Sequence, residues 1–199
     1  MNGSARQPLD AAIAAGDDQE FASLLERHYG PMLRLAKAIV ADERAAVAGV
    51  RRAWEVALRD QEPADGFPSL KAWLFSLVQA ELEDDPLTRD WDDVEDIDPS
   101  PFEREDDRWA GHWRDQSIPL PWTRESIAAD GNGLAQLLCE LPSMHAVMLV
   151  LHDVEQLSDL EITALLGLMP DSQLALLHSA RTMLRSAIDR RTSRSDALQ

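Results

Sequence analysis

The residue types in this chain that could carry out chemistry are acidic pairs, histidines and one cysteine. Neighbouring carboxylates such as Asp84-Asp85 and Asp92-Asp93 are the kind of ligand that Mg²⁺ and Ca²⁺ prefer. Both pairs lie in a proline-bounded segment without the glycine and the ligand spacing of a metal loop, so solvated charge is the favoured interpretation. The five histidines are scattered, with no cysteine or carboxylate at metal-ligand spacing. We therefore expect neither a metal nor another cofactor.

The sequence also lacks the motifs of common catalytic sites. It contains no glycine-rich phosphate loop and no nucleophile motif, so we expect no enzymatic activity. An enzyme that uses the acidic pairs with a metal is kept as the least favoured alternative. Cys139 follows Leu137 and Leu138 and is interpreted as a small buried hydrophobe. A single cysteine excludes a disulfide within the chain, which fits a reducing cytoplasm.

The charge of the chain limits how it could meet nucleic acid. Its 199 residues include 36 acidic and 19 basic side chains, a formal net charge of −17. Because nucleic-acid affinity comes largely from basic side chains that displace counterions, bare DNA should repel this protein at long range. Any reading of DNA must be local or assisted by a partner. No apolar stretch approaches the roughly 20 residues of a membrane span, and residues 1–4 lack a signal pattern, so we expect a cytoplasmic protein.

The elements that must position these residues are predicted to be helices. A short helix over residues 9–15 is followed by one from Asp17 or Asp18 to about Ile39. Its apolar stripe consists of Phe21, Leu24, Leu25, His28, Met32, Leu35, Ala36 and Ile39. A helix over residues 43–60 should face inward with Val47, Val50, Trp54 and Leu58. Ser69 should cap a further helix that includes Trp73 and Leu82. Residues 1–85 are thus predicted to form a helical bundle.

The middle of the chain, residues 86–132, is predicted to be an acidic linker. It carries 13 acidic and 5 basic side chains together with five prolines, and it shows no sustained period. Three of the four tryptophans in this segment are difficult to explain in a solvated linker. We expect them to pin the linker onto one of the domains or onto a partner; they are Trp109, Trp113 and Trp122.

The last part, residues 133–199, is again predicted to be helical. Short helices over 134–141 and 143–154 precede a capping box at Ser158-Asp159-Leu160-Glu161, which opens a helix that ends at Gly167. A long final helix then starts at Pro170 or Asp171. Two helices joined by a tight turn with glycine, the second one long, form a helix-turn-helix pattern. The predicted fold class is all-α, with two small helical domains joined by the linker.

Several stretches resemble the extracytoplasmic-function (ECF) sigma factors of bacterial transcription initiation. In the first part these are AGDDQEF (15–21), LERHY (25–29) and SLKAWLF (69–75), the last similar to the family's tryptophan-leucine helix. In the last part, LPSMHAVMLVLHDVEQLS (141–158) resembles the signature LP…VLLLRDVEGLS, and LLHSAR (176–181) resembles LLHRAR. Residues 111–114 and Pro121-Trp122 resemble a linker of one subgroup. The match covers roughly residues 9–83 and 108–189.

This resemblance implies partners and contact residues. The first domain would bind core RNA polymerase and melt the −10 promoter element, and the second would read the −35 element in promoter DNA. The linker would pass through the polymerase cleft, where basic walls favour carboxylates, although a solvated spacer explains its composition equally well. The implied DNA-binding residues are Ser172, Gln173, His178, Arg181 and Arg185. The implied polymerase-binding residues are Arg34, Arg51, Arg52 and Trp54. An anti-sigma factor is a further implied partner.

The sequence departs from the family on the surface that should face DNA. Residues 79–85 read QAELEDD, so four carboxylates stand where the family has an asparagine and an arginine-rich stretch. Leu174 and Ser179 replace arginines in the final helix, and Arg181 is its first basic residue. A second hypothesis therefore stays open, namely a sigma-like regulator that has lost DNA reading. It would bind an anti-sigma factor or compete for core RNA polymerase.

Overall fold

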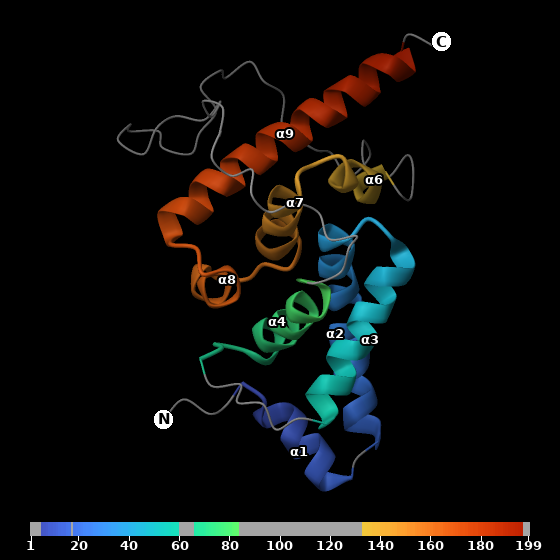
Figure 1. The fold of residues 1–199 in the computed structure, drawn as a ribbon, viewed down its shortest axis with the longest axis vertical. Helices are drawn as coiled ribbons and strands as arrows, with labels where there is room; N and C mark the ends of the chain where they lie inside the picture. The colour runs from blue at the N-terminus through green and yellow to red at the C-terminus, as the bar shows by residue number, and fades with distance from the viewer. Residues whose placement is uncertain (1–4, 17, 60–65, 84–132, 197–199) are drawn as a thin grey trace.

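The structure, a computed structural model, describes residues 5–16, 18–59, 66–83 and 133–196. Within these ranges the chain is all-α, as predicted, with eight α-helices, one short π-helix and no strand (Figure 1). The first half contributes α1 (Gln7–Ala15), α2 (Asp18–Ile39), α3 (Glu43–Arg59) and α4 (Leu70–Glu83). The last part contributes α6 (Gly133–Cys139), α7 (Ser143–Leu149), the π-helix η1 (Val150–Val154), α8 (Asp159–Leu166) and α9 (Pro170–Asp196).

The helices of the first half form where caps and apolar spacing place them. The apolar stripe predicted for α2 is buried or half-buried along its whole length. α3 begins after Asp42, whose carboxylate accepts a hydrogen bond from the Ala45 N–H (2.8 Å). Ser69 caps α4, as predicted, because its Oγ accepts from the Ala72 N–H (3.2 Å). Each cap satisfies a backbone donor that the helix itself leaves without a partner.

The buried face of α3 differs from the predicted one. Val50 and Trp54 are buried as expected, but Val47 and Leu58 are 38% and 44% exposed. The buried face instead consists mostly of small residues: Ala46, Gly49, Val50, Ala53, Trp54 and Ala57. Small side chains let α3 approach α4 so closely that a Cβ on Gly49 would lie 2.5 Å from Leu82. With this small-residue face against α4, Val47 and Leu58 are left partly exposed.

The last part contains the predicted helices with two differences. The helix expected over residues 143–154 continues from α7 into η1, where the Glu155 N–H donates to the Val150 carbonyl (2.8 Å). Cys139 was expected to be buried but is exposed. Its exposure follows from helical geometry, because each residue advances about 100° and Leu137, two residues earlier, faces the core.

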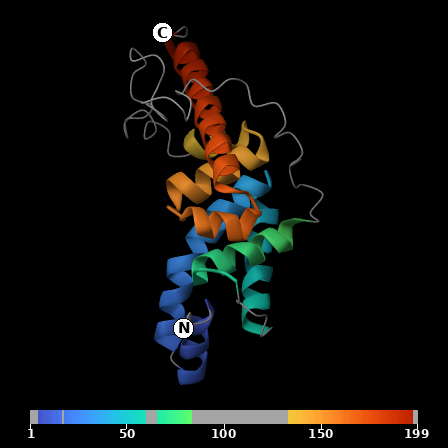
Figure 2. The ribbon, with the colours of Figure 1, turned by 90° about the vertical axis from the view of Figure 1, so that its left-hand side faces the viewer.

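A division into two domains is not seen among the described helices. α7 packs on α2, α8 packs on α4, and one hydrophobic cluster includes buried residues of both groups (Figures 1 and 2). α7 and α8 lie between α4 and the long helix α9, while α1 lies at the opposite end of the molecule. The predicted linker (86–132), its tryptophans and both acidic pairs lie outside the described residues.

None of the described helices is by itself long and apolar enough to span a membrane, although α8 and α9 taken together across their bend have the required length and composition.

Candidate nucleic-acid interface

The first helix of the predicted helix-turn-helix is α8, and it starts at the predicted capping box. The Ser158 N–H donates to Oε2 of Glu161 (2.9 Å), and the Ser158 Oγ faces the Glu161 N–H (3.4 Å). Ile162 and Leu165 then bury the inner side of the helix. Gly167 ends it with φ 67, a left-handed conformation that glycine adopts without steric cost.

The turn after α8 is fixed by a buried glutamine of the second helix. The Gln173 Nε2 donates to the Leu168 carbonyl (2.8 Å), to Oγ1 of Thr163 (2.7 Å) and to the Asp159 carbonyl (3.2 Å). Thr163 Oγ1 in turn donates to the Leu168 carbonyl (3.1 Å). α8 and α9 meet at 94°, within the range of helix-turn-helix motifs. Residues 158–185 thus contain two nearly perpendicular helices joined by a short turn.

The structure places the five predicted DNA-binding residues in different surroundings. Ser172 is exposed near the start of α9, whereas Gln173 is 4% exposed and its amide hydrogens are directed at the turn. In this position Gln173 holds the two helices together and does not face a base edge. His178, Arg181 and Arg185 are half-buried along the following turns. The five residues thus share one helix, but they do not form a single exposed face.

Arg181, the first basic residue of α9, is held by an acid of the preceding helices. Its guanidinium contacts both carboxylate oxygens of Asp153, with Nη2–Oδ1 at 2.6 Å and Nε–Oδ2 at 3.0 Å. His152 Nδ1 lies 2.8 Å from the same Oδ1. Burial raises the pKa of Asp153, but hydrogen bonds from Arg181 and His152 outweigh it, so this pKa lies below its ordinary value. Arg185 lies near Asp189 (3.7 Å) and its side chain is 13% exposed.

The exposed surface at the start of α9 is acidic and apolar. Asp171, Leu174 and Ala175 are exposed there, and from α8 to residue 180 the sequence has no lysine or arginine. Exposed Leu160 and Met169 flank this region on α8 and on the turn. Phosphate contacts normally come from basic side chains and helix N-termini. At the N-terminus of α9 the negative charge of Asp171 would repel a phosphate. Base contacts at the start of α9 would therefore need phosphate contacts supplied by another part of the chain or by a partner.

The predicted polymerase-binding residues lie on α2 and α3. Arg51 is exposed and pairs with Glu55 (3.0 Å), and Arg52 donates to the carboxylate (2.9 Å) and carbonyl (3.0 Å) of Glu81 on α4. Glu81 is one of the four carboxylates that depart from the family pattern, so this one is partly neutralised by Arg52. Glu83 is exposed, and Asp84 and Asp85 lie outside the described residues.

The other two predicted polymerase contacts, Trp54 and Arg34, make contacts with other helices of the chain. Trp54 is 6% exposed and meets Phe21 of α2 edge to face, with ring centroids 6.5 Å apart. Trp54 therefore packs α3 against α2 and offers little surface to a partner. The Nε of Arg34 donates to Oε1 of Glu155 at 2.6 Å, so this arginine faces the last part of the chain.

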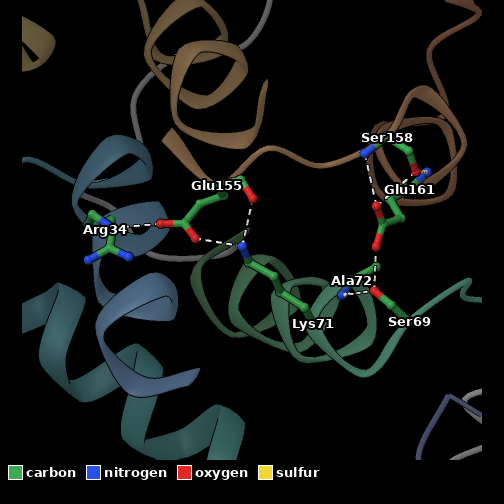
Figure 3. A network of polar contacts seen from close by, with 7 residues as sticks. All are labelled: Arg34, Ser69, Lys71, Ala72, Glu155, Ser158 and Glu161. Atoms are coloured by element: carbon green, nitrogen blue, oxygen red, sulfur yellow. Dashed lines mark hydrogen bonds and ion pairs between the residues drawn. The ribbon is translucent and has the colours of Figure 1, made fainter. Parts of the chain in front are cut away.

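A polar network at this junction was not expected from the sequence (Figure 3). Lys71 of α4 reaches the carboxylate (2.7 Å) and the carbonyl (2.8 Å) of Glu155, and Ser69 donates to Oε1 of Glu161. Burial raises the pKa of Glu155, but the hydrogen bonds and charges of Arg34 and Lys71 bring it below its ordinary value. The available signal was the position of Ser69, Lys71 and Glu155 inside the family-like stretches 69–75 and 141–158, with Glu161 in the predicted capping box just after the second.

No group of three or more histidine, cysteine, aspartate or glutamate side chains suited to a metal ion occurs among the residues that the structure describes. Comparison of the chain with protein-family models, with curated proteins and with solved structures finds no match.

Proposed function

We propose that this chain is a sigma factor of the ECF type, which binds core RNA polymerase and directs promoter-specific transcription initiation in the cytoplasm. The observation that carries the proposal is the arrangement of α8 and α9. Two helices at 94°, joined across a left-handed Gly167 and clamped by Gln173, have the geometry of helices that enter the major groove. They follow a helical bundle in the order in which the family-like stretches occur.

The surface of the first helices supports a contact with a large protein partner. Arg51 exposes a cationic side chain on the same side of α3 as the exposed apolar residues Val47 and Leu58. Arg52 lies on the neighbouring side, where it pairs with Glu81 of α4 and stays partly exposed. Interfaces between proteins combine apolar area with arginine in this way. Beneath them, buried Trp54 keeps α3 in place. We assign this face to core RNA polymerase.

Promoter recognition by this protein would depend on the polymerase. The net charge of −17 repels the DNA backbone at long range, and Arg181 is the first base on α9. In a polymerase complex the enzyme supplies the phosphate contacts and positions α9. Exposed Ser172 would then contact base edges, as hydroxyl side chains do.

Run-off transcription tests the proposal. Purified chain, core RNA polymerase and fragments of the source genome are combined, and products are compared with those of core enzyme alone. The proposal expects discrete products that appear when the chain is added. Absence of any promoter-dependent product, with a known sigma factor active in the same assay, would contradict it.

A second candidate function is a sigma-like regulator without DNA reading, which binds an anti-sigma factor or competes for core RNA polymerase. The observation in its favour is the start of α9, where Asp171, Leu174 and Ala175 are exposed while Gln173 and Arg181 are engaged inside the protein. Affinity purification of the tagged chain from its own cells distinguishes a decoy for an anti-sigma factor from a competitor for core RNA polymerase. Recovery of an anti-sigma factor without polymerase would support the decoy, whereas promoter-specific DNA crosslinks to α9 would exclude both forms.

A further inference from the structure

One carboxylate of the last part of the chain is bound by cations from two helices of the first half. Glu155 follows η1, and its side chain is 3% exposed. Arg34 of α2 donates to Oε1 at 2.6 Å, and Lys71 of α4 lies 2.7 Å from Oε2 and 2.8 Å from the Glu155 carbonyl oxygen (Figure 3). Both carboxylate oxygens are therefore used in joining the last part of the chain to α2 and α4.

A second polar contact lies on the α8 side of the same junction. Glu161 uses Oε2 for the capping box of α8 and Oε1 to accept a hydrogen bond from Ser69, the cap of α4. The first turns of α8 and α4 are thus linked through two capping residues. Apolar contacts of α7 with α2 and of α8 with α4 complete the junction.

The two cations differ in their access to solvent. The Lys71 side chain is 26% exposed and lies under the junction, whereas the Arg34 side chain is 51% exposed. An acidic group from outside can therefore approach Arg34 while Glu155 is still bound. Breaking a buried ion pair by removing one partner is costly, whereas exchanging that partner for another acid preserves the interaction. Such a junction is suited to exchange of one carboxylate for another.

We propose that Glu155 is an internal latch, which holds η1 and α8 over the Arg34–Lys71 face of α2 and α4 and keeps the free chain closed. The partner that fits this face is an acidic protein surface, which replaces Glu155 on the two cations and releases α7 to α9. The further claim that the latch inhibits polymerase binding rests on the proposed function, because Arg34 is one of the residues predicted to bind polymerase. The latch itself concerns the free chain and is testable without any partner.

The test of the latch compares the full-length Glu155→Gln variant with wild type and with Glu43→Gln. The control removes the same charge from an exposed pair, Lys37–Glu43, which lies wholly within the first helices. We expect Glu155→Gln to increase the radius of gyration in small-angle X-ray scattering. Amide hydrogen exchange should become faster in α7 and in the first turns of α4, while residues of α3 keep wild-type exchange. The control should match wild type in both measurements.

A second variant keeps the test decisive if Glu155→Gln unfolds. Arg34→Gln changes a half-exposed side chain and removes the same ion pair from the other side. It should give the same faster exchange in α7, with helix content by circular dichroism unchanged. Wild-type exchange in α7 in the folded variants would overturn the latch.

Binding to core RNA polymerase tests the inhibitory role separately. If closure masks the binding face, Glu155→Gln should bind about tenfold more tightly than wild type or Glu43→Gln, because a larger fraction of the chain is competent. Faster exchange in α7 with unchanged polymerase affinity would overturn the inhibitory role. If no variant binds polymerase at all, the proposed function fails, while the scattering and exchange data still decide on the latch.

Discussion

Arg34 and Glu155 lie 121 positions apart in the chain, and the arginine Nε donates to the glutamate Oε1 at 2.6 Å. The pair joins α2 to the residues that follow η1, across the segment predicted to be a linker. Because the carboxylate is buried and the arginine is half exposed, this contact connects the core of the molecule to its surface. It also connects a residue predicted to bind a partner with the family-like stretch before α8.

Removing Lys71 should destabilise the protein more than removing a comparable surface lysine. Lys71→Met leaves the buried Glu155 carboxylate with Arg34 and removes the cation that lies 5.7 Å from the Phe75 ring centroid. Because hydrogen bonds to charged groups contribute about 1.5–3 kcal/mol, we expect a loss of that size in the free energy of unfolding. Urea denaturation followed by circular dichroism measures it.

The control for Lys71→Met is Lys37→Met, in which the lost partner is the exposed Glu43. An exposed ion pair contributes about 0–1 kcal/mol, so this variant should unfold close to wild type. Equal losses in the two variants would show that the junction at Glu155 contributes no more than a surface pair.

Two glycines in helices should respond differently to alanine. In α3 a Cβ on Gly49 would lie 2.5 Å and 2.8 Å from Cδ2 and Cγ of Leu82, which is fully buried, so the Leu82 side chain or the two helices would have to shift. Overpacking of this kind costs about 1–3 kcal/mol, more than the gain in helix propensity, which is about 1 kcal/mol. Gly49→Ala should therefore lower the melting temperature.

Gly30→Ala in α2 is the matched substitution, in which the new Cβ makes no close contact with a residue distant in the chain. Its Cβ would meet Nη1 of Arg34 at 3.5 Å, an ordinary van der Waals contact. We expect a change of less than about 1 kcal/mol in the free energy of unfolding, because the gain in helix propensity is offset by crowding of the new Cβ against Pro31, whose ring disfavours the helical conformation in the residue before it. A stabilised Gly49→Ala would mean that α3 and α4 pack less closely than the structure shows.

Local rules predicted the helices well because their signals lie within a few residues of one another. The stripe of α2, the Ser69 cap, the Ser158–Glu161 capping box and the stop at Gly167 each follow from such spacing. The face of α3 was predicted wrongly because apolar size was taken as the signal for burial. The contact with Leu82 shows that small residues mark the closest approach.

Contacts between distant segments could not be predicted from spacing. Ser69 and Glu161 are 92 positions apart, and nothing local to either residue reveals the other. Gln173 shows the same limit at shorter range. Its place in the second of the two helices suggested contact with a base, but the hydrogens of a buried amide must find acceptors. The Leu168 carbonyl of the turn and the Asp159 carbonyl at the start of α8 supply them.

Gln173 should matter for stability whether or not the protein binds DNA. Gln173→Ala removes hydrogen bonds to two backbone carbonyls and to Thr163, and it leaves a gap at the turn. Loss of a buried hydrogen-bonded group costs about 1–3 kcal/mol, so the variant should unfold at lower urea concentration. Ser172→Ala, at the exposed neighbouring position, should be nearly neutral. A Gln173→Ala variant with wild-type stability and altered promoter choice would instead assign the amide to base reading.

Stability should fall as the pH is lowered below about 6.5, the ordinary pKa of histidine. Burial lowers the pKa of His145, and burial together with the charges of Arg27 and Lys71 lowers the pKa of His28. Below pH 6.5 the unfolded chain binds protons that the folded chain does not, so the unfolded state is favoured until the pH passes the lowered values. Stability is therefore retained above this window and decreases within it.

Urea denaturation at several pH values between 5 and 8 measures this effect. The double variant His28→Gln and His145→Gln should show a flatter dependence between pH 6.5 and 5.5. His145 is the more informative site, because its Nε2 lies 3.0 Å from the Ser179 Oγ and its buried Nδ1 has no partner among the described residues. An unchanged slope in the double variant would locate the titrating groups elsewhere.

Freeing Arg181 should strengthen contact with DNA. Asp153 occupies the guanidinium of Arg181 through both oxygens, as a phosphate would, and Asp153→Asn removes this competing charge. One additional phosphate contact makes the plot of log affinity against log salt steeper by about 0.9. The expected result is a steeper slope and tighter binding of duplex DNA at low salt, measured by fluorescence anisotropy. Glu26→Gln removes an equal charge from an exposed position on α2, away from α9, and should change affinity through net charge alone. Identical slopes for the two variants would mean that Arg181 does not reach a phosphate and that α9 faces a protein partner.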